Sequence, residues 1–210
     1  LEEAYLLSRQ EVTVTIVEMF GQVMPRLLDP EMSLLVEADM KARGLQLMLN
    51  RKVTAIEGSG GVERVRLDSG AVVPADAVLI SAGVRCNTEL AKAAGLEVGE
   101  RGLKVNEYLQ TSDPDIYAGG DVIEYPSHLT GRPILGQLRP NAVIAGRVIA
   151  WNVLGAGSKY PPFINSLCTK FYDKCIAAAG LTESMARESG MRVLARTQTS
   201  TSMHSMMRGR

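Results

Sequence analysis

Two consecutive glycines and an acid, Gly119, Gly120 and Asp121, are the residues of this chain best suited to ligand chemistry. They end the run TSDPDIYAGGDV at 111–122 (the 111–122 motif), which predicts a turn, a short apolar strand and a glycine loop. Open α/β sheets bind ligands at the carboxyl ends of their strands. Glycine lets a backbone approach a ligand closely, and a carboxylate accepts hydrogen bonds from sugar or polyol hydroxyls. The motif therefore predicts a binding site, with a Gly-Gly-Asp surface turn as the alternative.

A second acid with a defined position is Glu18, which follows the β-branched run at 12–17. In a dinucleotide-binding βαβ unit, an acid in this place accepts hydrogen bonds from the adenosine ribose, about 20 residues after a G-x-G-x-x-G loop. The 210 residues contain no such loop, so we expect the chain to begin inside the helix that the loop would open. The carboxylate would repel a 2′-phosphate, which favours NADH over NADPH. A solvated acid at the end of a strand is the alternative.

The pattern of elements around these residues predicts an α/β fold. A helix is expected at 2–9, a buried strand at 12–17, a helix from Asp29 and Pro30 to Gly44, and a strand at 45–49. A meander of strands should follow at 53–57, 62–67 and 71–73, then a buried strand at 78–83 and a helix at 89–94. Further along, the sequence predicts a helix from Ala142 to Leu154 capped by Asn141, a linker at 155–162 and a last unit containing a helix that starts at Thr182 and Glu183.

The composition excludes several classes of protein. Hydrophobic residues make up 46% and charged residues 22%, which is typical of a globular chain. The 23 basic residues balance the 23 acidic ones, so nothing favours nucleic acid or an anionic membrane as a partner. The three cysteines, at 86, 168 and 175, lack metal-site or redox-motif spacing. They are expected to be reduced, buried thiols of a cytoplasmic protein, and no metal site is predicted.

The 111–122 motif resembles the second flavin fingerprint of the FAD-dependent pyridine nucleotide-disulfide oxidoreductases. The resemblance continues in SAGVRCNTEL at 81–90, where the family usually has proline in place of Cys86, and in the A-x-x-x-G-R pattern of Ala142, Gly146 and Arg147. By this resemblance, Asp121 contacts the ribityl chain of FAD, and Gly119 and Gly120 lie against the cofactor. The same resemblance places Ala82 and Gly83 near the nicotinamide, and directs the start of the helix from Ala142 at the flavin pyrimidine edge.

The resemblance also implies a domain organisation. Residues 1–103 would form a partial Rossmann-like NAD-binding domain with its β-meander, without the first strand and glycine loop. Residues 104–158 would form the C-terminal segment of an FAD-binding domain. Residues 159–210 would form part of an α+β dimerisation domain, on the likeness of KFYD at 170–173 and AGLTE at 179–183, which implies a homodimer.

The branch that fits best is that of the NADH oxidases and coenzyme A-disulfide reductases. Its reaction passes hydride from NADH to FAD, and electrons then reach a disulfide, polysulfide, peroxide or oxygen. The redox cysteine of this branch lies in the N-terminal FAD segment, so no catalytic residue is assigned here. Two alternatives stay open: a relative of the ferredoxin and rubredoxin reductases, and a fragment that is inactive by itself. His204 could face a partner's flavin, although tail histidines are commonly solvated, and His128 is expected at the surface.

Overall fold

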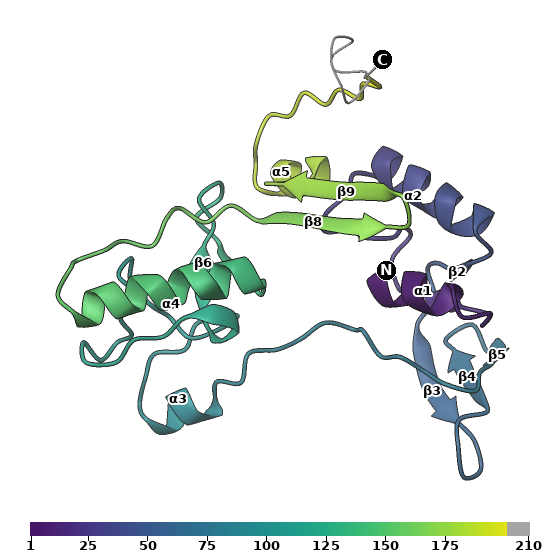
Figure 1. Cartoon of the computed structure of the whole chain (residues 1–210), viewed down its shortest axis with the longest axis horizontal. Coiled ribbons are helices and arrows are strands. Elements are labelled where there is room, and N and C mark those ends of the chain that lie inside the picture. Colours follow the sequence, from purple (N-terminus) through teal and green to yellow (C-terminus); the bar gives the residue numbers. More distant parts are fainter. Residues whose placement is uncertain (201–210) are drawn as a thin grey trace, which may run out of the picture.

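Residues 1–200 are described by a computed structural model, in which the helices and strands gather into two lobes (Figure 1). The first lobe contains α1 (Glu2–Ser8), β1 (Thr15–Val17), α2 (Pro30–Ala42), β2 (Gln46–Met48), β3 (Val53–Glu57), β4 (Arg64–Leu67), β5 (Val72–Pro74), β8 (Ser166–Phe171), β9 (Lys174–Ala179) and α5 (Glu183–Glu188). The second lobe contains α3 (Glu89–Ala93), the 3₁₀ helix η1 (Gly120–Val122), β6 (Glu124–Pro126), β7 (Pro133–Leu135) and α4 (Arg139–Val153). The α/β class predicted from the sequence is confirmed.

The first lobe begins with a parallel pair of strands joined through a helix. β1 pairs with β2, with Thr15 opposite Gln46, and α2 connects them. Pro30 lies in the first turn of α2, where its missing N–H costs nothing. The carboxylate of Asp29, expected to cap α2, instead accepts a hydrogen bond of 2.6 Å from the backbone N–H of Glu183. This bond ties the start of α2 to the start of α5.

The three-stranded meander forms as the sequence predicted. β3, β4 and β5 form an antiparallel sheet in that order, and a register shift interrupts the pairing of β3 with β4 near Val53. Val65 and Leu67 alternate with exposed arginines along β4, which gives the sheet one apolar and one charged face. Glu57 forms ion pairs with Arg64 and Arg66 on the charged face.

The strand expected at 78–83 is absent. Residues 77–88 have no regular structure, and the side chains of Leu79, Ile80 and Val84 are 63%, 72% and 68% exposed. A strand is stabilised by pairing with a neighbour, and in the described chain β1 and β2 pair only with each other. The apolar run at 78–83 therefore has no strand to join. The same lack of neighbours leaves β1 half-buried and limited to residues 15–17 of the expected 12–17.

Two further boundaries differ from those predicted. The apolar part of the 111–122 motif does not form a strand. Its Tyr117 makes one isolated antiparallel bridge with Gln110, and η1 begins three residues later at Gly120. α4 starts at Arg139 with Leu138 as its N-cap, so Asn141 lies inside the first turn. The Asn141 amide donates to the carbonyl oxygen of Gly136 over 2.8 Å instead of capping the helix. Pro140 explains the earlier start, since proline is favoured in a first turn.

The C-terminal hairpin, β8 and β9, shares a hydrophobic core with the beginning of the chain. Phe171 is 1% exposed and Ile176 is 9% exposed, and both pack with Met40 of α2 in a cluster that also contains Val23, Leu28 and Leu45. The guanidinium of Arg43 lies over the Tyr172 ring, 4.1 Å from its centroid. Residues 166–179 are therefore attached to the first lobe through burial and a cation–π contact.

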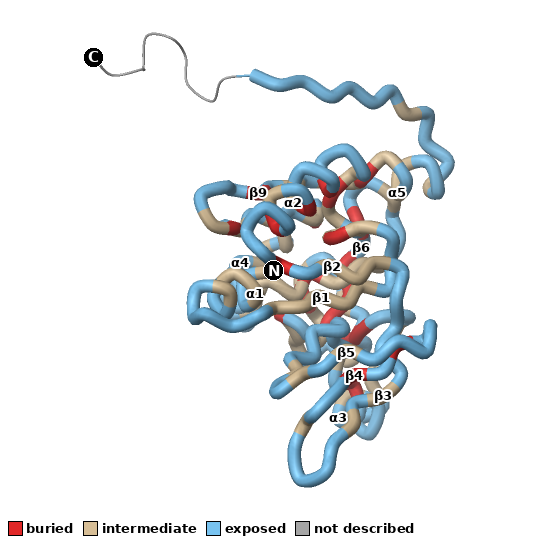
Figure 2. Tube along the Cα trace, turned by 90° about the vertical axis from the view of Figure 1, so that its right-hand side faces the viewer, coloured by how far each residue is buried: buried red, intermediate tan, exposed pale blue. Residues whose placement is uncertain are grey.

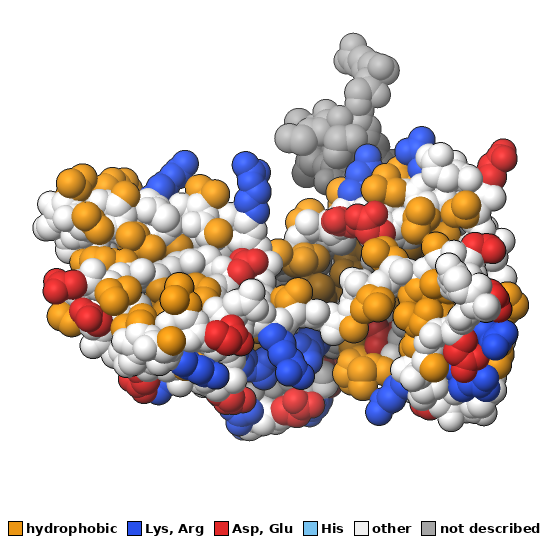
Figure 3. Space-filling view, turned by 90° about the horizontal axis from the view of Figure 1, so that it is seen from below, with side chains coloured by type: hydrophobic (Ala, Val, Ile, Leu, Met, Phe, Trp, Pro, Cys, Tyr) orange, Lys and Arg blue, Asp and Glu red, His pale blue; other side chains and the backbone are white. Residues whose placement is uncertain are grey.

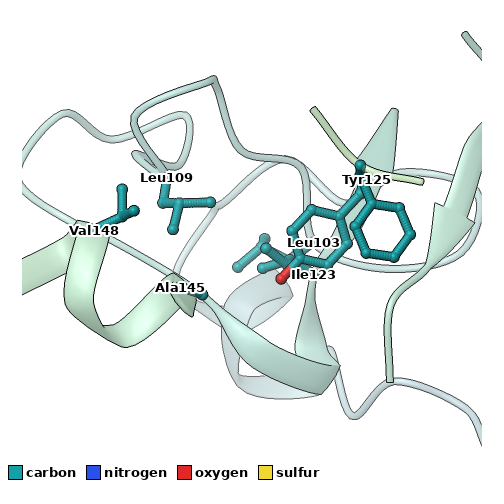
Figure 4. Packing of buried hydrophobic residues seen from close by; sticks show 7 residues of the cluster. Leu103, Leu109, Ile123, Tyr125, Ala145 and Val148 are labelled. Atoms are coloured by element: carbon teal, nitrogen blue, oxygen red, sulfur yellow. The ribbon is translucent and has the colours of Figure 1, made fainter. Parts of the chain in front are cut away.

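A second core supports the 111–122 motif (Figure 4). Its buried members are Leu103, Leu109, Ile123, Tyr125, Ala145, Val148 and Phe163. The linker expected at 155–162 is anchored to this lobe by Asn152, whose amide donates to the carbonyl oxygens of Tyr108 and Ser158, each over 2.8 Å. Phe163, on the far side of the linker, belongs to the same core.

The chain is more open than a compact protein of its size. Its accessible surface is 14588 Å² for 22.7 kDa, whereas a folded monomer of that mass exposes about 9,500 Å². Figure 2 shows the buried residues as short stretches separated by exposed and intermediate ones. On α4, Trp151 is 54% exposed and Val153 is 66% exposed. The two lobes thus present apolar surface beyond what their own cores use.

The shared core predicts a large effect of removing the Phe171 ring. The Phe171→Ala variant should lower the free energy of unfolding by about 3–5 kcal/mol, because a fully buried aromatic ring is lost and a cavity remains. Lys170→Ala, on the exposed face of the same strand, should change it by less than about 0.5 kcal/mol. Urea unfolding followed by circular dichroism measures both variants. Equal stability of the two variants would contradict the packing of the hairpin on α2.

Candidate functional site

The two glycines of the 111–122 motif are favoured for different reasons, close packing on α4 at Gly119 and backbone conformation at Gly120. An ideal Cβ atom on Gly119 would lie 2.9 Å from the Cβ of Ala145 and 3.0 Å from the Cδ1 of Ile149. Gly120 has φ +80°, in the left-handed region, and a Cβ there would lie 3.5 Å from the Cβ of Ala142. The close approach of the motif to α4 therefore depends on glycine at position 119, and the backbone conformation favours glycine at position 120. The structure places both glycines against α4, close to Ala142 and Ala145.

Asp121 presents its side chain to solvent at the edge of this packed loop. Its backbone carbonyl oxygen accepts a hydrogen bond of 3.0 Å from the Cys86 thiol. Burial raises the pKa of Cys86, and the negative charges of Asp121 and Glu124 raise it further. Cys86 is therefore held as a neutral thiol, which anchors the segment from 82 to 86 beside the motif. Sequence reasoning missed this contact, and the only signal was a cysteine in a position where the resembling family has proline.

The first turn of α4 borders the same loop. The N–H groups of Asn141 and Ala142 bond to the carbonyl oxygen of Leu138, and Pro140 has no N–H. The turn therefore attracts an electron-rich group mainly through the helix dipole and the exposed charge of Arg139, rather than through many free N–H groups.

Tyr125 supports the motif from within the core. It is 2% exposed, and its ring stacks on Phe163 with centroids 4.7 Å apart and lies 5.0 Å from the Tyr160 ring. A Cβ on Gly136 would lie within 2.9 Å of both the Phe163 and the Tyr125 rings, so glycine is required beside the stack. Burial raises the pKa of Tyr125. Its hydroxyl, drawn in Figure 4, has no hydrogen-bond partner among the described residues.

Glu18 lies at the carboxyl end of β1, as predicted. Its backbone N–H donates to the carbonyl oxygen of Met48, and its own carbonyl oxygen accepts from the N–H of Arg51, both over 3.0 Å. One carboxylate oxygen accepts a hydrogen bond of 2.9 Å from the N–H of Phe20. Backbone pairing and this bond hold the half-exposed carboxylate at the edge of the sheet, where a ribose ligand would meet it.

Ala82 and Gly83 are exposed residues of segment 75–88, which connects β5 of the first lobe to α3 of the second (Figure 1). Gly83 has φ +89°, and a Cβ on it would meet no atom within 4 Å. Glycine is therefore used here for its backbone conformation rather than for close packing. The chain continues from this glycine to Cys86 and so to the 111–122 motif. The residues predicted for dinucleotide and for flavin are thus divided between the two lobes.

A groove of about 810 Å³ separates α4 from the C-terminal hairpin (Figure 3). Leu138 and Pro140 at the start of α4 form one wall, and small residues of β8 and β9 form the other. Cys168 and Cys175 are exposed on this hairpin, which corrects the expectation of buried thiols. Residues on a strand alternate between faces, and the buried face is taken by Phe171 and its neighbours.

Residues 1–200 contain neither a cluster of metal ligands nor a membrane-spanning helix. No group of three or more metal-ligating side chains is found there. No helix in this part of the chain is long and apolar enough to cross a membrane. His128 is exposed, as predicted, and His204 lies outside the described residues.

A parallel strand pair joined by a helix, an antiparallel meander and a glycine loop packed on a second helix define the chain as an α/β protein. The sequence profile of the pyridine nucleotide-disulphide oxidoreductases matches residues 1–144, more than half of the chain. The chain belongs to this family.

Relatives and solved structures agree with this assignment. The NADH oxidase of Methanocaldococcus jannaschii is 40% identical over 182 residues, which are 87% of this chain and 40% of that protein. The CoA-dependent NAD(P)H sulfur oxidoreductase of Pyrococcus furiosus is 35% identical over 90% of this chain and 43% of its own length. The structure of an NAD-dependent persulfide reductase from A. fulgidus superposes with a TM-score of 0.88 at 37% identity, covering 90% of this chain and 35% of that one. This chain thus spans about two fifths of the length of the curated relatives it matches.

Two further similarities bear on cofactor and acceptor. An engineered water-forming NADPH oxidase bound to NADPH, made from the Lactobacillus brevis enzyme, has a TM-score of 0.84 at 26% identity, over 90% of this chain and 42% of that one. Five residues were replaced in that enzyme. Three of them are consecutive, an aspartate followed by an alanine and a methionine. The others are a proline seven residues after the aspartate and a glycine before it. The rubredoxin-NAD(+) reductase of Ectopseudomonas oleovorans is 34% identical over 70% of this chain and 38% of its own length.

The close packing of the motif on α4 predicts opposite effects of two glycine-to-alanine changes. Gly119→Ala should lower the free energy of unfolding by about 1–3 kcal/mol, because the added methyl would overlap the side chain of Ala145. Gly146→Ala, inside α4 with open space at its Cβ, should raise it by about 0.5–1 kcal/mol through helix propensity. The two melting temperatures should move in opposite directions. A Gly119→Ala variant as stable as the wild type would show that the loop does not need to lie so close to the helix.

Proposed function

We propose that, in a protein of the relatives' length, this chain supplies the NADH-binding unit and one half of the FAD site of a flavoprotein oxidoreductase. The reaction would pass hydride from NADH to FAD and then electrons to a disulfide, polysulfide, peroxide or oxygen. One observation carries this proposal: the Gly119–Gly120–Asp121 loop packs on the first turn of α4 and leaves the acid exposed beside a helix start.

The residues present fit the flavin half of such a site. Asp121 would accept hydrogen bonds from the ribityl hydroxyls, and Gly119 and Gly120 leave no side chain between backbone and cofactor. Ala142, in the first turn of α4, would lie near the flavin edge that carries oxygen atoms, where the helix dipole and the Arg139 charge favour electron density. Bound FAD would supply the two-electron carrier that accepts hydride. The protein's contribution is to hold and orient it.

Glu18 would bind the adenosine ribose of the dinucleotide and select NADH. Its carboxylate can accept from both ribose hydroxyls, and it would repel a 2′-phosphate. Ala82 and Gly83 would leave room for the nicotinamide, because neither has a bulky side chain. The replaced positions of the engineered NADPH oxidase have counterparts at the same spacing in this chain. Glu18 corresponds to the aspartate, Met19 and Phe20 to the two residues after it, and Pro25 to the proline seven residues further on. This match supports the segment as the one that selects the nucleotide.

The electron acceptor is proposed from the relatives rather than from residues of this chain. The NADH oxidase and the sulfur and persulfide reductases support oxygen and sulfur compounds as acceptors. Cys86 is unsuited to nucleophilic work, because its pKa is raised. The same proposal includes three further points. Residues 159–210 belong to a dimerisation domain, the protein is a homodimer, and it is located in the cytoplasm.

A rubredoxin or ferredoxin reductase is the second candidate. The similarity to a rubredoxin-NAD(+) reductase supports it. That similarity covers 149 residues, whereas the sulfur oxidoreductase matches over 191, which favours the first candidate. A fragment that binds neither cofactor well is the third reading. Steady-state NADH oxidation by a protein that extends this chain to the relatives' length, with each acceptor class supplied in turn, separates the first two.

The nucleotide preference can be tested on this chain. NADH should bind more tightly than NADPH, and combined replacement of Glu18 by Ala and Met19 by Arg should reverse the preference, because repulsion of the 2′-phosphate becomes attraction. Dissociation constants from the fluorescence of the reduced nucleotide measure this, with Glu31→Ala as a control on an exposed acid elsewhere. A wild-type chain that binds NADPH as tightly as NADH would refute the assignment of nucleotide selection to Glu18.

The flavin site is expected to be incomplete in this chain. The purified chain should be colourless, because Asp121 and its loop supply only part of the contacts that hold a large cofactor. In a protein of the relatives' length, Asp121→Ala should weaken FAD binding by about tenfold, the loss of one or two charge-assisted hydrogen bonds. Absorbance at the flavin band after gel filtration measures the flavin content of the purified chain and the FAD retained by the Asp121→Ala variant. A yellow 210-residue preparation near one flavin per chain would contradict the division of the site.

A further inference from the structure

A buried polar pair of α2 holds the loop that follows Glu18. This loop, residues 19–28, connects β1 to α2 and carries Val23 near its centre. The N–H of Val23 donates to the Oε1 of Glu37 over 3.2 Å, and its carbonyl oxygen accepts from the hydroxyl of Ser33 over 2.8 Å. The Ser33 Oγ also lies 3.1 Å from the same Glu37 oxygen. Both backbone groups of Val23 are thus bound by two side chains one turn apart on the helix.

Burial of this pair is expensive for the fold. Ser33 is 0% exposed and Glu37 is 5% exposed, and among the described residues no ion pair neutralises Glu37. A buried carboxylate costs several kcal/mol unless hydrogen bonds compensate it. Apolar side chains at these two positions would extend the core around Met40 without that cost. The polar pair therefore serves to fix the loop rather than to fill the core.

The fixed position of Val23 is transmitted to Glu18 over a short stretch of chain. The N–H of Phe20 donates to the Glu18 carboxylate, and the carbonyl oxygen of Phe20 accepts from the N–H of Asn50 over 2.9 Å. Only residues 19–22 separate Glu18 from Val23. The Val23 side chain is itself buried, so the loop is held both by its backbone and by its apolar contact. Release of Val23 would leave Phe20 with only its bond to Asn50 on that side, and would loosen the orientation of the Glu18 carboxylate.

We propose that Ser33 and Glu37 are positioning residues for the dinucleotide. By binding both backbone groups of Val23, they orient the Glu18 carboxylate toward the adenosine ribose of NADH, which neither of them touches. The inference rests on the proposed function of Glu18. It implies that nucleotide selection depends on two buried residues of α2 as well as on the exposed acid.

The first test measures the loop without any nucleotide. Glu37→Ala should raise the amide exchange rate of Val23 and the rate of tryptic cleavage at the exposed Arg26 by about tenfold, because a hydrogen bond and its partner are lost. Glu37→Gln retains an oxygen acceptor and should stay within about twofold of the wild type. Ser33→Ala, a smaller change, should give an intermediate increase and serves if Glu37→Ala does not fold. Unchanged exchange at Val23 in both alanine variants would overturn the inference.

The second test separates positioning from general loss of structure. Glu37→Ala should weaken NADH more than NADPH, so that the ratio of their dissociation constants moves toward one, because a displaced Glu18 no longer rejects the 2′-phosphate. Glu37→Gln should restore the wild-type ratio, and Glu31→Ala, on the exposed side of α2, should not alter it. Equal weakening of both nucleotides would overturn the positioning role. If the wild-type chain binds no NADH, the proposed function and the ligand part of this inference are both refuted. If the wild type binds NADH and Glu37→Ala leaves the ratio of the NADH and NADPH dissociation constants unchanged, only the inference is refuted.

Discussion

Contact between the 111–122 motif and α4 is the constraint on which the candidate flavin site depends. The loop lies so close to the helix that a methyl group on Gly119 would overlap Ala145. The next residue, Gly120, has a left-handed backbone and lies against Ala142 in the first turn of α4, and Asp121 follows it directly. The aromatic stack of Tyr125 and Phe163 holds the other side of the same loop. The geometry of the site thus follows from packing density rather than from a hydrogen bond to the acid itself.

The first lobe uses a different means to position its acid. Glu18 ends a strand that has one neighbour, so the sheet alone gives it limited support. Its backbone N–H donates to Met48, its carbonyl oxygen accepts from Arg51 and its carboxylate accepts from Phe20, while the buried residues of α2 hold the loop beyond it. The C-terminal hairpin covers α2 from the outside through Phe171. Residues from both ends of the described chain therefore stabilise the surroundings of a single carboxylate.

The sequence predicted well those elements whose stability is local. The meander, α1, α2 and the start of α5 follow from turn residues, caps and apolar spacing, which act over a few residues. It failed for 78–83, since an apolar run becomes a strand only beside another strand. It also misplaced the start of α4 by choosing Asn141 as the cap, whereas Pro140 and Leu138 set the boundary. The cysteines were expected to be buried, but the alternation of the hairpin turns two of them outward.

By itself, the sequence determined the family, the glycine-acid motif and the two acids most suited to cofactor binding, because these depend on residue types at fixed spacing. Only the tertiary structure decided that Cys86 meets the backbone of Asp121, that Asn152 anchors the linker, and that Ser33 and Glu37 reach Val23. These contacts join residues distant in the chain or side chains whose direction depends on packing, and no local pattern encodes them. Asp121 is the residue on which the proposed flavin contact depends, and its exposed position is created by α4 and the core beneath the motif.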